Sequence, residues 1–431
     1  MTARLERPAP RPRPGGGASG GGGRGSVPVA PLLALVGLGV VAALSLSLLS
    51  LSGPGGAAAG PTPPPGATGR PPGPGPGQPT PNPSVVVTPP PEQRVQVRGS
   101  ILFVRTGNIW SVSGEKLTQL SDKGTDSWPM WAPDGQRIYF TETRTTVADA
   151  PYQGRYSKYT LYYPVLMSMN ADGTDRKEIQ SGLYELGGAR NRKYFHQLLQ
   201  GDVSPDGTRF ALVSDSPNPL DPAQSVTLSL VPIAGGRVTN LGVKHNRGLG
   251  HNDPDWSPDG KHIAFSYNGT SGRLGAPRVA IHTVATKRLR YVGPRGFANP
   301  SWSPDGRYIV GERTGTSGRD LLIVDTANGA DVIRLTRDGR SFAPVFSPDG
   351  TQIAYLRLNG QAIDLRVMTL RDDGSLQPGD DRAITEDGSI DASSAPQWWF
   401  PEELRPPAPS NIPSVAPATP TRSPSPSSAA P

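Results

Sequence analysis

A short motif recurs five times along this chain, at irregular intervals of about fifty residues. Its fullest form, P-x-W-S-P-D-G-x-x-I-A-F, runs from Pro254 to Phe265. The S-P-D-G tetrad has the composition of a tight turn, because proline presets φ, aspartate suits a central turn position and glycine accepts a positive φ. Apolar residues flank the turn on both sides. Each copy therefore predicts a β-hairpin and not a catalytic motif.

The copies differ in detail but keep the turn. The five complete copies begin at Pro129, Gly201, Pro254, Pro300 and Pro344. One copy carries Ala132 in place of the serine, and another carries Phe346 in place of the tryptophan. A sixth copy, with Pro396 and Trp398, stops after its first strand.

Two further alternating runs follow each hairpin, for example Leu321 to Asp325 and Val332 to Thr336. Four strands per repeat are typical of one blade of a β-propeller. The repeats therefore predict an all-β propeller of about fifty residues per blade, which suits six blades between residues 99 and 400.

The sixth blade draws its strands from both ends of this region. Three strand signals without a preceding first strand occupy Ile101 to Arg105, Asn108 to Val112 and Lys116 to Gln119. The truncated copy at Pro396 to Trp399 supplies the missing strand. Closing the ring in this way removes the free sheet edges that promote aggregation.

The remaining segments have low complexity and are predicted to be disordered. Gly and Pro dominate residues 1–27 and 53–98, and Pro, Ser and Ala dominate residues 401–431. Such segments cannot bury enough apolar surface to offset the entropy of the chain. The linker at 53–98 is predicted to be a semi-extended spacer.

The positive charge of the chain lies outside the predicted propeller. Of the net +7, residues 1–27 contribute +4 and residues 53–98 contribute +2, while 401–431 are neutral, which leaves +1 for the propeller. Nucleic-acid binding needs clustered Lys and Arg, so the sequence predicts no nucleic-acid partner.

The segment Leu32 to Leu51 is an almost wholly apolar run of 20 residues. A helix of that length spans about 30 Å, the hydrocarbon thickness of a bilayer. Five arginines precede the run, so the positive-inside rule predicts a single-pass anchor at 28–52 with a cytoplasmic N-terminus and an extracytoplasmic propeller. The alternative is a signal peptide cleaved near Ala59, which would release a secreted protein. The chain has no cysteine, which excludes disulfides and a lipid-modified cysteine.

The motif P-x-W-S-P-D-G-x-x-I-A-F resembles the repeat of the TolB-type β-propellers, distant relatives of the WD-repeat propellers. In the namesake of that family, a periplasmic protein, the mouth of the propeller binds a peptidoglycan-associated lipoprotein, and a separate α/β domain precedes the propeller. In this sequence the apolar run and the linker occupy the place of that domain. The resemblance implies an envelope protein whose propeller binds another macromolecule.

The loops that lead into the first strand of each blade converge on one face of a propeller, around the central channel. We predict a polar rim there for a protein or peptide partner. The candidate residues are His196, Gln197, His251, Asn252, Asp253, Arg295, Asn299 and Ser341. The alternative is that these side chains only satisfy backbone groups in turns.

Two histidines and three tryptophans recur at corresponding positions of the repeats. His196 and His251 occupy nearly corresponding positions in adjacent repeats, but they lack the local spacing of a metal site, so no metal and no cofactor are predicted. Trp131, Trp256 and Trp302 recur at one position of the repeat, which indicates packing between blades.

The longest departure from the repeat is the insertion from Arg144 to Tyr159, which is rich in tyrosine, arginine and polar residues. Long insertions on a rigid scaffold are often binding loops, and the alternative is a surface loop without a role.

No enzymatic site is readable in the sequence. The one G-x-S-x-G match, Gly17 to Gly21, lies in a glycine run and not between a strand and a helix. About 31 residues follow Phe400, which is too few for a hydrolase domain. The expected function is therefore a non-enzymatic protein-binding or scaffold module, and the alternative is a small-ligand, glycan or peptide sensor or enzyme that uses the channel mouth.

Overall fold

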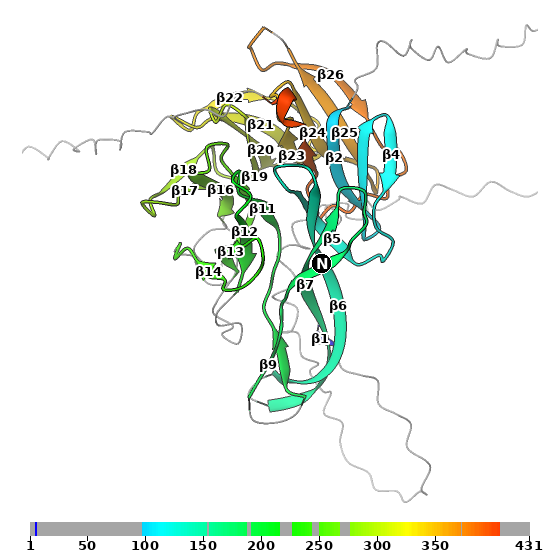
Figure 1. The fold of residues 1–431 in the computed structure, drawn as a ribbon. Coiled ribbons are helices and arrows are strands. Elements are labelled where there is room, and N and C mark those ends of the chain that lie inside the picture. The colour runs from blue at the N-terminus through cyan, green and yellow to red at the C-terminus, as the bar shows by residue number, and fades with distance from the viewer. Residues whose placement is uncertain are drawn as a thin grey trace, which may run out of the picture.

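A computed structural model of the chain describes residues 5–6, 97–152, 155–187, 191–215, 226–243, 250–267, 276–371 and 373–405. The described residues form a six-bladed β-propeller, as the sequence predicted (Figure 1). The apolar run at 32–51 and most of the linker lie outside them. None of the helices in the described part is both long and apolar enough to cross a bilayer.

Five blades are antiparallel sheets built from four consecutive strands, and in blade 1 the two-residue strand β1 (Leu5–Glu6) also pairs with the third strand. Blade 1 contains β5 (Asp126–Trp131), β6 (Arg137–Tyr152), β7 (Arg155–Asn170) and β8 (Lys177–Ser181). Blade 2 contains β11 (Gly201–Val203), β12 (Arg209–Ser214), β13 (Thr227–Pro232) and β14 (Thr239–Asn240). Blade 3 contains β15 (His251–Trp256), β16 (His262–Tyr267), β17 (Arg278–Thr283) and β18 (Leu289–Val292).

The next two blades repeat this order. Blade 4 contains β19 (Phe297–Trp302), β20 (Tyr308–Gly315), β21 (Gly318–Asp325) and β22 (Asp331–Arg334). Blade 5 contains β23 (Ser341–Phe346), β24 (Gln352–Asn359), β25 (Ala362–Leu370) and β26 (Pro378–Ala383). In each of the five blades the P-x-W motif, or its variant, forms the innermost strand.

Blade 6 joins the two ends of the domain, and this prediction is confirmed. Its innermost strand is β27 (Gln397–Trp399), and the other three are β2 (Val97–Arg105), β3 (Asn108–Gly114) and β4 (Lys116–Gln119). β27 is antiparallel to β2, with Ile101 opposite Trp398. The ring is therefore closed by backbone hydrogen bonds between its first and last strands.

The ordered fold continues a few residues beyond the predicted boundary at 400. The short 3-10 helix η2 (Glu402–Leu404) follows β27, and the Arg405 guanidinium then donates to the carbonyls of Phe400 and Pro133, each at 2.7 Å. The Trp399 indole N–H also donates to the Pro133 carbonyl, at 3.1 Å. Residues 401–405, predicted to belong to a disordered tail, thus hold the last blade against the first.

The S-P-D-G tetrads form the predicted hairpin turns, and their polar side chains stabilise them. In the copy at Ser257, the serine hydroxyl donates to Asp259 (2.7 Å) and accepts the backbone N–H of His262 (2.9 Å). Asp259 also accepts the N–H of Lys261 at 3.0 Å. The serines at 204, 303 and 347 make the same set of bonds. The tetrad is therefore a structural element of each blade.

The core lies between adjacent blades. Trp256 and Trp302 are each only 5% exposed and pack among the apolar side chains of neighbouring sheets. Trp131 is partly buried and contacts Trp399, with ring centroids 5.7 Å apart. The predicted packing role of the recurring tryptophans is confirmed.

The insertion at 144–159 is a pair of strands and not an irregular loop. β6 and β7 pair along their whole length, from Arg137 opposite Asn170 to Tyr152 opposite Arg155. The hairpin formed by β9 (Leu183–Glu185) and β10 (Lys193–Phe195) packs on it, and together they form an arm that projects from the propeller (Figure 1). The two-residue strand β1 (Leu5–Glu6) pairs with β7 at Thr160 and Leu161.

Candidate functional site

The innermost strands of the six blades surround the central channel, and one position of the repeat supplies most of its wall. This position is the residue just before the motif's first proline, or before Gly201 in blade 2. The six residues are Trp128, Gln200, Asp253, Asn299, Ala343 and Ala395. All but Ala343 line the channel. Five of the six blades therefore contribute this residue to the channel wall.

A β-bulge directs these residues in four of the blades. The pairing register shifts between the residue two before the proline and the residue after it, as from Asn252 to Asp255 in blade 3. The bulged residue has a positive φ, 50° for Trp128, 51° for Asp253 and 53° for Asn299. A bulge re-aims side chains. Aspartate and asparagine tolerate this left-handed conformation, whereas a tryptophan there is strained.

Hydrogen bonds to a neighbouring loop hold Trp128 in its strained conformation. Its backbone N–H donates to the Ser394 hydroxyl at 3.0 Å, and its indole N–H donates to the Ser393 carbonyl at 2.7 Å. Both acceptors lie in the loop that leads into β27. Trp128 thus joins the innermost strand of blade 1 to the segment that closes the ring.

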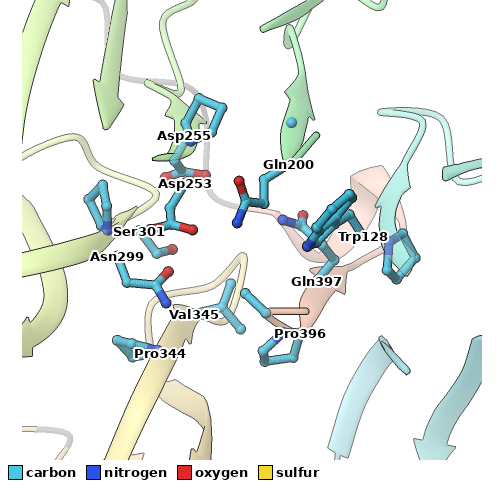
Figure 2. Close-up of a pocket in the computed structure, with 15 residues that line it drawn as sticks. Trp128, Gln200, Asp253, Asp255, Asn299, Ser301, Pro344, Val345, Pro396 and Gln397 are labelled. Atoms are coloured by element: carbon cyan, nitrogen blue, oxygen red, sulfur yellow. The ribbon is translucent and has the colours of Figure 1, made fainter. Parts of the chain in front are cut away.

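The channel is narrow. Two connected cavities, which share Gln200, Asp253, Asn299 and Ala395, offer about 50 Å³ in the throat and about 90 Å³ at the mouth to water-sized groups. Figure 2 shows Asp253, Asn299, Gln200 and Gln397 pointing toward the central space. Pockets that enclose small-molecule ligands typically hold about 300–1,000 Å³. This channel has room for a few water molecules or one slender side chain.

Acidic groups dominate the charged side chains of the mouth. The Asp253 carboxylate accepts a hydrogen bond from Ser266 at 3.1 Å. Glu312 accepts from Arg319 at 3.3 Å and from the Ala343 N–H at 3.0 Å, so the one arginine of the mouth is paired with a different carboxylate. Burial, together with the negative charge of Glu312, raises the pKa of Asp253 to about 7.

Polar side chains one residue beyond the motif's first residue, further along the innermost strands, tie successive blades together. Asp202 accepts the backbone N–H of Trp256 at 2.8 Å, and Asp255 accepts that of Trp302 at 2.6 Å. Ser301, at the same position of the next repeat, accepts the N–H of Phe346 at 3.3 Å. Each donor belongs to the blade that follows its acceptor, so these bonds run from blade to blade around half of the ring.

The carboxyl groups of Asp202 and Asp255 interact with each other as well. Burial raises the pKa of Asp202 to about 6. Burial and the charge of Asp202 raise the pKa of Asp255 well above its usual value. Two buried carboxylates in contact cannot both ionise readily, so the pair retains a proton near neutral pH.

Of the eight predicted rim residues, Asn252, Asp253 and Asn299 line the channel. The other five do not belong to its wall. His196 stacks on Tyr184 near the base of the arm, with ring centroids 4.7 Å apart. The backbone N–H of Gln197 donates to Asp215 at 2.7 Å.

The structure also places His251, Ser341 and Arg295 away from the channel, contrary to the prediction of a rim at these positions. His251 and Ser341 are the first residues of β15 and β23, and both are fully buried. The His251 Nδ1 accepts the Leu228 N–H at 2.9 Å, and the Ser341 hydroxyl donates to Asp338 at 3.2 Å. Arg295 is exposed. β15 and β23 begin earlier than predicted, so His251 and Ser341 do not reach the channel, whereas Arg295 lies in the loop before β19.

Sequence reasoning missed Trp128, Gln200, Gln397, Glu312 and Arg319, all of which line the channel or its mouth. For Trp128 and Gln200 a signal exists, because both hold the position before the motif's first residue. Glu312 and Arg319 come from β20 and β21, and only the tertiary structure brings them to the mouth. The described residues hold no group of three or more histidine, aspartate or glutamate side chains arranged to bind a metal ion.

Comparisons with known proteins bear on the fold. No known protein family and no curated protein sequence matches this chain. Among solved structures, TolB from Acinetobacter baumannii matches 70% of this chain and 66% of its own, with a TM-score of 0.50 and 18% identity. A protein described as TolB from Agrobacterium tumefaciens matches 69% of this chain and 93% of its own, with a TM-score of 0.47 and 17% identity. At 18% identity the likeness to the Acinetobacter baumannii protein shows a shared fold.

Proposed function

Because the chain is a six-bladed β-propeller of the TolB-like fold, we propose that it acts as a non-enzymatic protein-binding module of the cell envelope. The observation that carries the proposal is the size of the channel. With about 50 and 90 Å³ of free space, it cannot enclose a small-molecule substrate. A rigid ring of side chains from six blades instead suits a peptide or protein that covers the mouth and inserts a side chain.

The proposed partner is an extracytoplasmic protein or peptide. The test is in-cell crosslinking and affinity purification of the tagged protein, comparing the wild type with an Asp253→Asn, Asn299→Ala variant. The control is Glu185→Gln, whose side chain is 84% exposed on the arm. One envelope protein that is enriched by the wild type and the control but lost from the mouth variant is the expected result. Enrichment that does not depend on the mouth would refute the proposal and direct attention to the arm.

The proposed location is the cell membrane, with 28–52 as a single-pass anchor and the propeller outside. This topology is incompatible with the pairing of β1 and β7 seen in the structure, because the bilayer would separate residues 1–27 from the arm. A cleaved signal peptide near Ala59 is the second possibility, and it too would remove β1 from the mature protein.

The absence of native cysteines makes the topology directly measurable. We expect a membrane-impermeant maleimide to label Lys177→Cys, on the exposed edge of blade 1, in spheroplasts with an intact membrane. Thr2→Cys is expected to react only after the membrane is made permeable. Labelling of Thr2→Cys in intact spheroplasts would contradict the anchored topology and would favour a tail that lies on the same side as the arm.

A further inference from the structure

The chemistry of the channel mouth specifies what kind of side chain a partner inserts there. The wall carries the Asp253 carboxylate and the carboxamides of Gln200 and Asn299, which converge on one space in Figure 2. The Asn299 backbone N–H donates to the Ser266 hydroxyl, which in turn donates to Asp253, so the aspartate is fixed in position. The site is preorganised: Asp253 offers acceptors, and each carboxamide offers one acceptor oxygen beside its NH2 donors.

One acceptor of this site lacks a donor. The Oε1 atom of Gln200 is buried and has no hydrogen-bond partner among the described residues. An unsatisfied buried polar atom costs about 1–3 kcal/mol, which a bound donor would recover. Gln200 and Asp253 belong to adjacent blades, and both line the throat and the mouth.

The charge of the site favours a cation over an anion. Two carboxylates, Asp253 and Glu312, line the mouth with one base, Arg319, whose guanidinium is 3.3 Å from Glu312. Asp255 also lines the throat, where its carboxyl group shares a proton with Asp202 near neutral pH. Asp253 forms no salt bridge in the described structure, and Arg319, whose charge reaches it, is hydrogen-bonded to Glu312. A cation can therefore pair with Asp253, whereas an anion would be repelled by the acidic groups.

The shape of the channel favours a slender group. Prolines from five blades narrow the throat below the carboxylate. The lining prolines are Pro129, Pro254, Pro300, Pro344 and Pro396. A primary ammonium is a compact charge on an unbranched stem with three donors, while a guanidinium is a wider planar fork. Three donors match the three acceptor groups of Asp253, Gln200 and Asn299.

We propose that the channel mouth binds the ammonium group of a lysine side chain from an extended segment of the partner, held by Asp253, Gln200 and Asn299. This inference rests on the proposed binding function and adds the chemical identity of the inserted group. The lysine stem lies in the mouth, and the ammonium reaches the level of Asp253.

The test uses a random linear 12-residue peptide library displayed on phage and selected on the full-length protein in detergent. Selected peptides are expected to share a lysine at one fixed position. Asp253→Asn, which keeps the size of the side chain and an acceptor for Ser266, is expected to lose that preference, whereas the Glu185→Gln control keeps it. Circular dichroism and a thermal melt establish that each variant is folded.

A synthetic copy of a selected peptide then isolates the ammonium. Replacing its lysine by norleucine keeps the stem and removes the charge, and should weaken binding to the wild type about tenfold or more. On Asp253→Asn the same replacement should change the affinity less than threefold, because the two changes remove one interaction.

The outcomes separate the two proposals. Peptides that bind the mouth with no basic residue, or with arginine in its place, overturn the lysine inference and leave the binding function standing. If no peptide is selected and no envelope protein depends on the mouth, both proposals fail.

Discussion

At the scale of single residues, the least usual feature is a set of three partly buried acids whose pKa values lie above their ordinary range. Asp253 titrates at about 7 and Asp202 at about 6, and Asp255 is raised as well, with burial as the largest cause in each case. In the unfolded chain these groups titrate near 3.8. Between about pH 4 and pH 7 the folded protein therefore binds more protons than the unfolded chain.

The sign of this difference predicts that the free energy of unfolding falls as the pH rises from 5 to 8. The loss is of the order of a few kcal/mol, because each unit of pKa shift corresponds to about 1.4 kcal/mol. Thermal melts at pH 5 and pH 8 measure it, and the midpoint should be higher at pH 5. Below about pH 4 the trend reverses, since acids with lowered pKa values, such as Glu142 and Asp259, then lose their ionic partners.

Asp255→Asn tests which groups cause the effect. The amide oxygen can still accept the Trp302 N–H, but the charge next to Asp202 is gone. We expect this variant to be more stable than the wild type at pH 8, by about 1 kcal/mol or more, and to show a weaker pH dependence. Asp331→Asn, on the exposed edge of blade 4, is the control and should leave both quantities unchanged. Equal pH dependence in all three proteins would contradict the assignment.

The sequence placed residues at the channel only where local spacing was enough. Asn252, Asp253 and Asn299 were found because they lie next to the repeated proline. His251 and Ser341 were misplaced because a bulge and a change in strand start decide which neighbour faces the channel, and neither has a clear signal in a single sequence.

At the scale of elements, the hairpin turns show how one motif acquires different neighbours. Gly135 and Gly207 hold the same turn position, each with φ of +68°. A Cβ atom on Gly135 would lie 2.1 Å from the Trp399 indole, whereas on Gly207 its nearest neighbour is Pro133, at 3.9 Å. Replacing glycine by alanine therefore tests backbone strain alone at Gly207, and backbone strain plus a steric clash with Trp399 at Gly135.

Gly207→Ala should lower the free energy of unfolding by about 1–2 kcal/mol, the cost of a left-handed backbone conformation for a residue with a Cβ. Gly135→Ala should cost clearly more, because it also displaces Trp399 from the turn that it caps. Chemical denaturation of the two variants under one condition measures the difference. Equal destabilisation would show that the contact between Trp399 and this turn does not contribute to stability.

The strands of the arm could not be predicted from the sequence. The insertion was expected to be a loop, yet β6 and β7 extend through it as paired strands. Residues 145–148 and 159–163 are rich in Thr, Val and Tyr, which favour strands, but their pairing depends on a second hairpin, β9–β10, that covers one face with Phe195. That covering contact is tertiary and leaves no local pattern.

At the scale of the whole molecule, the fold could be predicted because the repeat is nearly self-contained. Each of the five complete copies marks a blade by its own turn, and the truncated sixth copy implies that the other three strands of its blade lie at the opposite end of the domain. Register and closure then follow from pairing β27 with β2.

Two truncations test this closure. Removing residues 406–431 should leave the midpoint of thermal unfolding unchanged, since the described contacts of the C-terminal segment end at Arg405. Removing residues 396–431 deletes β27 and the Trp399 contacts, and should abolish a single cooperative transition, because it opens the ring along β2. A cooperative, wild-type-like melt of the shorter chain would show that the first and last strands do not need to meet.

The pairing of β27 with β2 also sets the order in which the protein can mature. The Trp398 indole N–H bonds to the Arg98 carbonyl across 300 residues of sequence. The ribosome makes β27 last, so β2, β3 and β4 keep an open sheet edge until almost the whole domain has been synthesised. Contacts between such distant residues form slowly. The nascent propeller is therefore vulnerable to proteases and to aggregation until its final strand arrives.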